Sequence, residues 1–207
     1  MTSDATVMAY DEMGEELDFS RCRLEFKLNI RPRDGEPSDY LLHYDGIIYP
    51  GEDLDQPVGT ISVYVADLPR AYYNGEDPWE VLDCENSGVA HFCELISLRT
   101  RCFKPSVERF IGNQIEPLLI IFHLSIEPQF RGNDLGLKAI DIACENLGQS
   151  AVVALFAFPT QWQGCVDTNP KAFLEDQSKL ISYYRRGAFV PVLKGGLMLR
   201  PWILKKQ

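Results

Sequence analysis

The first third of the chain alternates apolar and polar residues at the period of two that is typical of β-strands. The alternation covers residues 23–30, 40–49 and 58–66. Residues 31–38 hold prolines and a glycine that favour a turn, and residues 50–56 read as a polar loop. We therefore expect three half-buried strands in this part of the chain.

Helical signals follow these strands. Residues 67–77 are expected to form a loop. The pair Asp77-Pro78 is typical of a helix start, because aspartate caps free N–H groups and proline suits the first helical position. Apolar residues at helical spacing come next, with an expected break at residues 86–88, and a shorter helix is expected at residues 106–111.

The most informative pattern runs from residue 118 to residue 148. Residues 118–126 are an apolar run of strand length, which Pro128 ends because proline cannot donate to a sheet ladder. A short loop at residues 129–134 leads to apolar positions at helical spacing that stop at Gly148. Strand, loop and helix in this order direct a helix N-terminus, with free N–H groups and partial positive charge, at the loop. Phosphate is the usual ligand of such a site.

The C-terminal part continues this arrangement. Residues 150–158 are expected to be a strand, so that strand, helix and strand form one right-handed βαβ crossover with two parallel neighbours. After a loop, Asn169-Pro170 repeats the helix-start signal. Residues 189–193 and 197–204 are expected to form a hairpin, since the paired glycines between them suit a tight two-residue turn.

Two motifs in this region resemble motifs of the GNAT superfamily of N-acetyltransferases. Motif A of that family is an apolar strand followed by V-x-P-x-x-R-G-x-G-x-G, and residues 126–136 read I-E-P-Q-F-R-G-N-D-L-G. Asp134 stands where the family usually has glycine. The family string Y-x-x-x-G-F is similar to residues 184–189, with Ala188 in place of glycine. The segments D-L-P-R-A-Y-Y-N-G-E-D-P-W-E-V-L-D and L-L-I-I-F-H-L-S-I-E-P-Q-F-R-G-N-D-L-G also resemble little-characterised bacterial GNAT-like proteins.

The resemblance implies an α/β (α+β) fold of the GNAT type. Its sheet is mixed and mostly antiparallel, with a central parallel βαβ crossover and helices on both faces. The expected domain covers residues 21–207, and the acidic residues 1–20 are expected to be a flexible tail.

The resemblance also implies an enzyme that transfers acetyl from acetyl-CoA to an amine by direct attack. The backbone near Leu124 or Ile126 would stabilise the oxyanion, and Tyr184 would protonate the departing thiolate. The strand at residues 118–126 would splay from the strand at 150–158 to admit the pantetheine arm. The pyrophosphate would be held by the loop residues Arg131, Gly132, Asn133, Asp134, Leu135 and Gly136. The alternative is a GNAT-fold binding or regulatory module that has lost catalysis.

The strand at residues 118–126 adds candidates of its own. Strict alternation would place Phe122, Leu124 and Ile126 on one apolar face and His123 and Glu127 on a face that turns polar toward the C-terminal end. His123 or Glu127 is therefore a candidate to relay the proton of the amine. A bulge in the strand would shift this pairing of faces.

Each candidate also has a structural interpretation. Asp134 is equally suited to capping the helix, which would occupy the amides that phosphate needs. Arg131 is a surface arginine or a phosphate ligand, and Tyr184 a packing residue or an acid. His123 could be a satisfied, partly buried histidine, and Glu127 a solvated carboxylate.

Composition narrows the remaining classes. The chain has 207 residues, a net charge of −10 and six cysteines without a C-x-x-C pair. We expect one domain with reduced cysteines and no metal site, and no nucleic-acid partner because phosphate would be repelled. A cytoplasmic protein is expected, since no membrane span and no secretion signal are found. The acceptor is a small-molecule or protein amine of unknown identity, and the oligomeric state is open, with a homodimer among the options.

Overall fold

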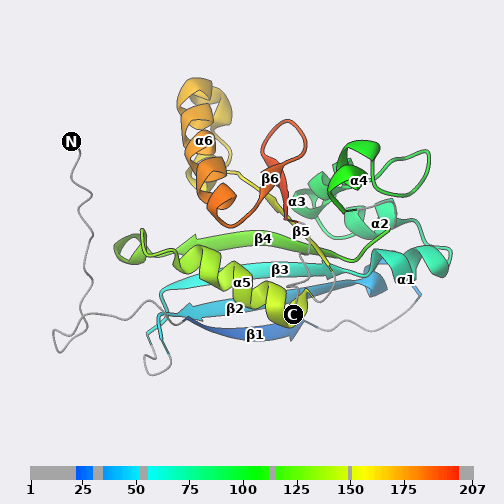
Figure 1. The fold of residues 1–207 in the computed structure, drawn as a ribbon, viewed down its shortest axis with the longest axis horizontal. Coiled ribbons are helices and arrows are strands. Elements are labelled where there is room, and N and C mark those ends of the chain that lie inside the picture. Colours follow the sequence, from blue (N-terminus) through cyan, green and yellow to red (C-terminus); the bar gives the residue numbers. More distant parts are fainter. Residues whose placement is uncertain (1–21, 30–34, 52–55, 112–114, 149–150, 201–207) are drawn as a thin grey trace.

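A computed structural model of the chain describes residues 22–29, 35–51, 56–111, 115–148 and 151–200. In these residues seven strands form one sheet in the order β1-β2-β3-β4-β5-β7-β6 (Figure 1). Neighbouring strands are antiparallel except β4 and β5, which are parallel. The fold is therefore mixed and mostly antiparallel, as the sequence predicts. The expected tail at residues 1–20 lies outside the described residues.

The strands lie close to their expected positions. Their bounds are Arg23–Asn29 (β1), Leu41–Tyr49 (β2), Gly59–Ala66 (β3), Leu118–Ile126 (β4), Val152–Phe156 (β5), Val190–Pro191 (β6) and Leu197–Arg200 (β7). The first four form an antiparallel run, and α5 connects β4 to its parallel neighbour β5, which confirms the βαβ unit.

Six α-helices and five short 3-10 helices complete the described residues. The α-helices are Leu68–Tyr73 (α1), Pro78–Asp83 (α2), Ser87–Ala90 (α3), Pro105–Ile111 (α4), Leu135–Leu147 (α5) and Pro170–Arg186 (α6). The 3-10 helices are Pro37–Tyr40 (η1), His91–Leu95 (η2), Pro128–Phe130 (η3), Thr160–Trp162 (η4) and Val166–Thr168 (η5). None of the helices in the described ranges is long and apolar enough to cross a membrane.

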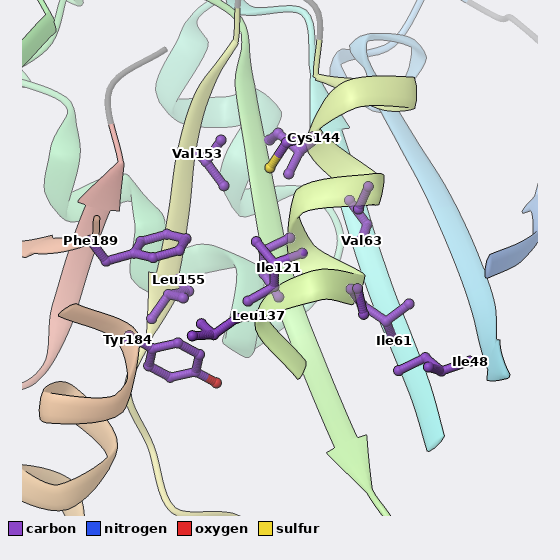
Figure 2. Close-up of a cluster of buried hydrophobic side chains, with 14 of the residues drawn as sticks. Ile48, Ile61, Val63, Ile121, Leu137, Cys144, Val153, Leu155, Tyr184 and Phe189 are labelled. Carbon is purple, nitrogen blue, oxygen red and sulfur yellow. The ribbon is translucent and has the colours of Figure 1, made fainter. Parts of the chain in front are cut away.

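Buried side chains form a cluster on each face of the sheet. On the side that we call the α5 face, Ile121 of β4 lies in one cluster with Leu137 of α5 (Figure 2), and Leu119 and Ile140 belong to the same cluster. On the opposite side, the α1–α4 face, Leu118 and Ile120 pack with residues of α1 to α4 and η2. Helices therefore cover both faces, as expected, and the alternation along the first half of β4 divides its side chains between the two clusters.

Residues 67–77 differ from the expected loop, because they contain helix α1. The carboxylate of Asp67 accepts a hydrogen bond from the Arg70 N–H at 3.2 Å, and Leu68 and Ala71 are buried on the α1–α4 face. This is the capping contact that Asp77 makes to Trp79 N–H and Asn169 makes to Ala172 N–H. The same cap-and-proline signal was therefore present at Asp67, and burial of an apolar face stabilises even a helix of this length.

The C-terminal hairpin forms, but its turn is longer than expected. Val190 and Pro191 pair with Leu199 and Met198, so that residues 192–196 connect the two strands. The paired glycines at the end of this connection both have positive φ, which residues with a Cβ rarely adopt. The part of the expected second strand beyond residue 200 lies outside the described residues.

A buried glutamine attaches helix α6 to this connection and to the end of β5. Gln177 is 7% exposed, and its Nε2 donates to the carbonyl oxygens of Ala157 at 3.1 Å and Gly195 at 2.9 Å. Both carbonyls belong to irregular backbone that has no ladder partner at these atoms among the described residues. The side chain therefore satisfies the buried carbonyl of Ala157, binds the more exposed carbonyl of Gly195, and fixes α6 beside the end of β5.

We predict that Gln177→Leu lowers the free energy of unfolding by about 1–3 kcal/mol, because it leaves the buried carbonyl of Ala157 without a donor and removes the bond to Gly195. Urea denaturation followed by circular dichroism measures the change. Gln163→Leu, at an exposed position of the preceding loop, is the matched control and should stay within about 0.5 kcal/mol of the wild type. Equal stability of both variants would show that Gln177 does not tie the elements together.

Candidate functional site

The parallel strands β4 and β5 separate halfway along β4. Their pairing runs from Leu118 with Val152 to Ile121 with Leu155 and ends there. Residues 122–126 of β4 continue along β3 but have no partner on the β5 side among the described residues. The backbone groups that face this side are thus available to something other than a strand. The divergence agrees with the splay expected between these two strands.

A β-bulge lies where the strands separate. The register between β3 and β4 passes from Val63 opposite Ile121 to Ser62 opposite His123, so Phe122 is the inserted residue. As a consequence Leu124 and Ile126 pack on the α5 face together with Leu119 and Ile121. The expectation that Phe122, Leu124 and Ile126 share one face is therefore wrong, because one extra residue reverses the alternation.

Aromatic rings flank the separation on the α1–α4 face. The ring of Phe122 lies edge-on to Tyr64 at 5.4 Å between centroids, and the ring of Phe156 stacks on His91 at 5.6 Å. Helix α3 touches the first of these rings, since a Cβ built on Gly88 would lie 2.5 Å from Phe122. Phe122 and Phe156 each follow directly after the last paired residues of their strands. This face of the separation is therefore lined by apolar rings.

The loop after β4 presents unpaired amides. Gly132 has φ of +93° and Asp134 has φ of 56°, and these left-handed residues turn the chain from η3 into α5. Among the described residues no acceptor is found for the N–H groups of residues 132–136. They front a helix of 13 residues, so the loop combines free donors with the positive end of the helix dipole.

Asp134 occupies the N-cap position of α5 but does not cap the helix with its side chain. Its carboxylate forms an ion pair with the guanidinium of Arg186 at the end of α6. The alternative interpretation, in which the carboxylate takes up the loop amides, does not describe this structure. The backbone of Asp134 is left-handed, a region that Asp and Asn tolerate better than most residues.

Arg131 donates from Nε to the carbonyl oxygen of Ile126 at 2.8 Å, and its side chain is exposed. This bond closes the loop over the end of β4. The Nη groups of the guanidinium have no partner among the described residues. Arg131 can therefore hold the loop and still offer charge to an anion.

Tyr183 is a site residue that the sequence did not indicate. Its hydroxyl oxygen accepts a hydrogen bond from the Leu137 N–H at 3.1 Å, so it satisfies a free amide in the first turn of α5. A Cβ on Gly136 would lie 2.7 Å from this oxygen and 3.2 Å from a methyl of Leu124. Burial raises the pKa of the Tyr183 phenol, and the bond from Leu137 opposes the rise. Contact between α5 and α6 thus requires glycine at position 136.

Tyr184, the expected acid, is buried in the α5-face cluster. Its ring lies edge-on to Tyr183 and Phe189, at 5.4 and 5.9 Å between centroids. Figure 2 shows its hydroxyl turned away from Phe189 and toward the side of β4, near Leu137. Burial raises the pKa of the phenol, and Tyr183 adds to the rise. A phenol is protonated at neutral pH without this rise, and the rise makes Tyr184 a weaker proton donor.

An open groove of about 510 Å³ runs along α6 beside this loop. It is lined by Ser178, Lys179, Ser182, Tyr183 and Arg186. The ion pair of Arg186 with Asp134 joins the groove to the loop amides. Lys179 also has a carboxylate neighbour, Asp176, whose hydrogen bond raises the lysine pKa. The lining therefore holds two basic side chains, each paired with a carboxylate, and two serines whose hydroxyls donate to carbonyl groups of α6.

The other two catalytic candidates lie at the surface. His123 is exposed on β4 just beyond the bulge, which differs from the partly buried position considered above. Glu127 is exposed at the start of the loop and accepts a hydrogen bond from Gln129 at 2.7 Å. Both are in reach of solvent at the end of β4, and their role as proton relays stays a prediction.

A serine, a histidine and an aspartate also meet on β2 and β3. His43 Nε2 lies 2.8 Å from Ser62 Oγ and 3.3 Å from Asp45 Oδ1. A nucleophile–base–acid series needs the hydroxyl and the carboxylate on opposite ring nitrogens. Here both are on the same nitrogen, and Nδ1 faces the Asn29 amide at 3.3 Å. The arrangement is therefore a polar network and not a hydrolase triad.

No group of three or more His, Cys, Asp or Glu side chains in the described ranges is placed to hold a metal ion. Comparison of the chain with protein-family models and with curated protein sequences gives no match to either.

We predict that Gly136→Ala lowers the free energy of unfolding by about 1–3 kcal/mol, because the added methyl collides with the Tyr183 hydroxyl. Tyr183→Phe alone should cost about 0.5–1.5 kcal/mol through the lost bond to Leu137. In the double variant the collision is relieved, so its loss of stability should be smaller than the sum of the losses in the two single variants. Chemical denaturation of the four proteins measures this coupling, and strict additivity would contradict it.

Proposed function

We propose that the chain is an acyl-CoA-dependent N-acetyltransferase of the GNAT type. The observation that carries the proposal is the separation of β4 from β5 beyond Ile121 and Leu155, directly beside amides at the start of α5 that have no acceptor among the described residues. An extended thiol arm can pair with an open strand edge, and a diphosphate needs unpaired donors at a helix N-terminus. The motif resemblance of residues 126–136 and 184–189 points to the same ligand.

The loop residues fit a diphosphate in both hydrogen bonding and charge. The amides of residues 132–136 are free of acceptors within the described chain. The carboxylate of Asp134, which would repel phosphate, is neutralised by Arg186. Arg131 adds positive charge at the loop itself. In this proposal the pyrophosphate lies on residues 131–136, and the nucleotide end extends toward the groove along α6.

The chemistry assigned to the chain is mainly positioning. Acetyl-CoA supplies an activated acetyl group, and the acceptor amine displaces the thiol: the C–N bond forms, the C–S bond breaks, and one proton leaves the nitrogen. Backbone N–H groups of β4 near Leu124 or Ile126 would stabilise the oxyanion, since this stretch has no partner strand on the β5 side. Tyr184 would protonate the leaving sulfur, while His123 or Glu127 would accept the amine proton, directly or through water.

A second candidate function is a GNAT-fold module that binds a ligand without catalysis. Asp134 favours it, because a carboxylate stands at a left-handed position where the resembling motif has glycine. The two candidates differ in one measurable respect. The enzyme acetylates an amine from a panel of polyamines, amino acids, aminoglycosides and peptides, whereas the module acetylates none of them.

We predict that the protein binds CoA and acetyl-CoA, and that Arg131→Ala weakens this binding by about threefold to thirtyfold. Two effects combine in this variant, the loss of a cation and the loss of the bond that closes the loop on Ile126. Isothermal titration calorimetry measures the affinities for CoA and for acetyl-CoA. Arg99→Ala, at an exposed position far along the chain from the loop, is the control. Absence of heat at saturating CoA and acetyl-CoA would remove the proposal.

We also predict that Asp134→Gly tightens CoA binding by about twofold to tenfold, because it removes a negative charge and releases Arg186 to the phosphates. Glycine fits the left-handed backbone at this position without strain. Asp134→Asn separates the effect of the charge from the effect of the backbone conformation, since asparagine is neutral and also tolerates the left-handed region. Both variants should tighten binding if charge is the cause. Unchanged affinity in both would mean that Asp134 does not face the bound phosphates.

A further inference from the structure

Strand β1 ends the sheet at one side and leaves a long edge. All of its residues, from Arg23 opposite Tyr49 to Asn29 opposite His43, pair with β2 on the inner side. No described strand pairs with its outer side. A strand of 7 residues with one unpaired edge presents alternating N–H and C=O groups that another strand can bind. In Figure 1, β1 lies at the lower margin of the sheet, on the side opposite α6 and β6.

We propose that β1 pairs with β1 of a second copy of this chain, in antiparallel orientation, about a two-fold axis midway between the two copies of Phe26, which we call the axis at Phe26. This proposal does not depend on the function proposed above. The axis of such a dimer is perpendicular to the sheet, so each face of one sheet continues as the same face of the other. Paired residues must lie on the same face, and a strand alternates faces at every residue. One residue of β1 therefore lies directly opposite its own copy, with the axis midway between the two.

The order of charges along β1 determines the register, that is, which residue lies opposite its own copy. With the axis at Phe26, Glu25 lies opposite the partner's Lys27, and by symmetry Lys27 lies opposite the partner's Glu25. A shift of the axis to residue 25 brings Glu25 against its own copy, and a shift to residue 27 does the same for Lys27. Two residues that lie directly opposite each other on neighbouring strands stabilise the pairing if their charges are opposite and destabilise it if their charges are alike. Both side chains are exposed and so are available to a partner.

The apolar residues favour the same register. Leu24 and Phe26 pack partly against the α5-face cluster, and the ring of Phe26 lies edge-on to Tyr44 at 6.2 Å. Leu28, two residues further along the same face, is left 38% exposed. With the axis at Phe26, Leu28 lies opposite the partner's Leu24, so that the exposed leucine gains an apolar neighbour. Charged pairs on one face and apolar pairs on the other then agree on one arrangement.

The ends of the strand are compatible with this register. Arg23 would lie opposite the partner's Asn29, and these residues carry no like charges. Within its own chain Glu25 has Arg23 Nε of β1 at 3.6 Å and the Tyr49 hydroxyl of β2 at 3.4 Å. These contacts are long and exposed, so they do not withdraw the carboxylate from a cross-strand lysine. A charged edge can also serve to prevent pairing, and the experiment distinguishes the two roles.

The test measures the oligomeric state of the full chain by sedimentation velocity over a concentration series. The wild type should form dimers that dissociate on dilution. Glu25→Lys and Lys27→Glu should each weaken the dimer by at least about tenfold, because symmetry turns two attractive pairs into two repulsive pairs. An equimolar mixture of the two variants should dimerise again, since lysines at 25 and 27 then face glutamates. The variant with both substitutions should dimerise like the wild type.

Lys171→Glu, which makes the same charge change at an exposed position of α6, is the control and should not alter the dimer. Circular dichroism and CoA titration check that each variant keeps its fold and its other binding. A wild type that is monomeric at every concentration overturns the proposal. So does a dimer that the single variants leave unchanged, or a mixture of the two that fails to recover.

Discussion

The early end of the pairing between β4 and β5 is the constraint on which the rest of the site depends. Four paired positions, 118–121 with 152–155, hold the two strands together within the core. Beyond them β4 follows β3, while β5 turns to β7 and to the carbonyl of Ala157 that Gln177 binds. If β4 and β5 stayed paired along their whole length, the backbone N–H and C=O groups of residues 122–126 on the β5 side would bond to β5. Because the sheet opens, the strand edge, the loop amides and the groove along α6 lie in one continuous region.

Much of the fold could be predicted from the chain because the signals were local. The capping pairs at Asp77 and Asn169, the run at 118–126 and the stop at Gly148 agree with the elements that the structure describes. Helix α1 was missed although Asp67 carries a similar cap. The sequence around Leu68 and Ala71 is largely polar, so a prediction from neighbouring residues alone favours a loop. The stability of the helix comes instead from the packing of these two side chains against distant parts of the chain.

The site was less predictable, because it depends on how two helices approach. The sequence offered adjacent tyrosines at the end of α6, and the structure gives them different surroundings. Tyr184 is enclosed by the α5-face cluster, whereas Tyr183 reaches the first turn of α5 and binds the Leu137 amide. A helix turns by about 100° per residue, so neighbours cannot share a direction. Nor could the ion pair between Asp134 and Arg186 be foreseen, since 52 positions separate its partners in the chain.

The extra residue in β4 has an effect beyond the strand itself. Because Phe122 is inserted, Leu124 turns to the side of α5, and one of its methyl groups lies close beneath Gly136. With unbroken alternation this leucine would point away, and the first turn of the helix would have no apolar support there. The bulge thus places an apolar side chain against the first turn of α5, which carries the free amides. Insertions and deletions in this strand would therefore be felt first by the helix start, and not by the strand in which they occur.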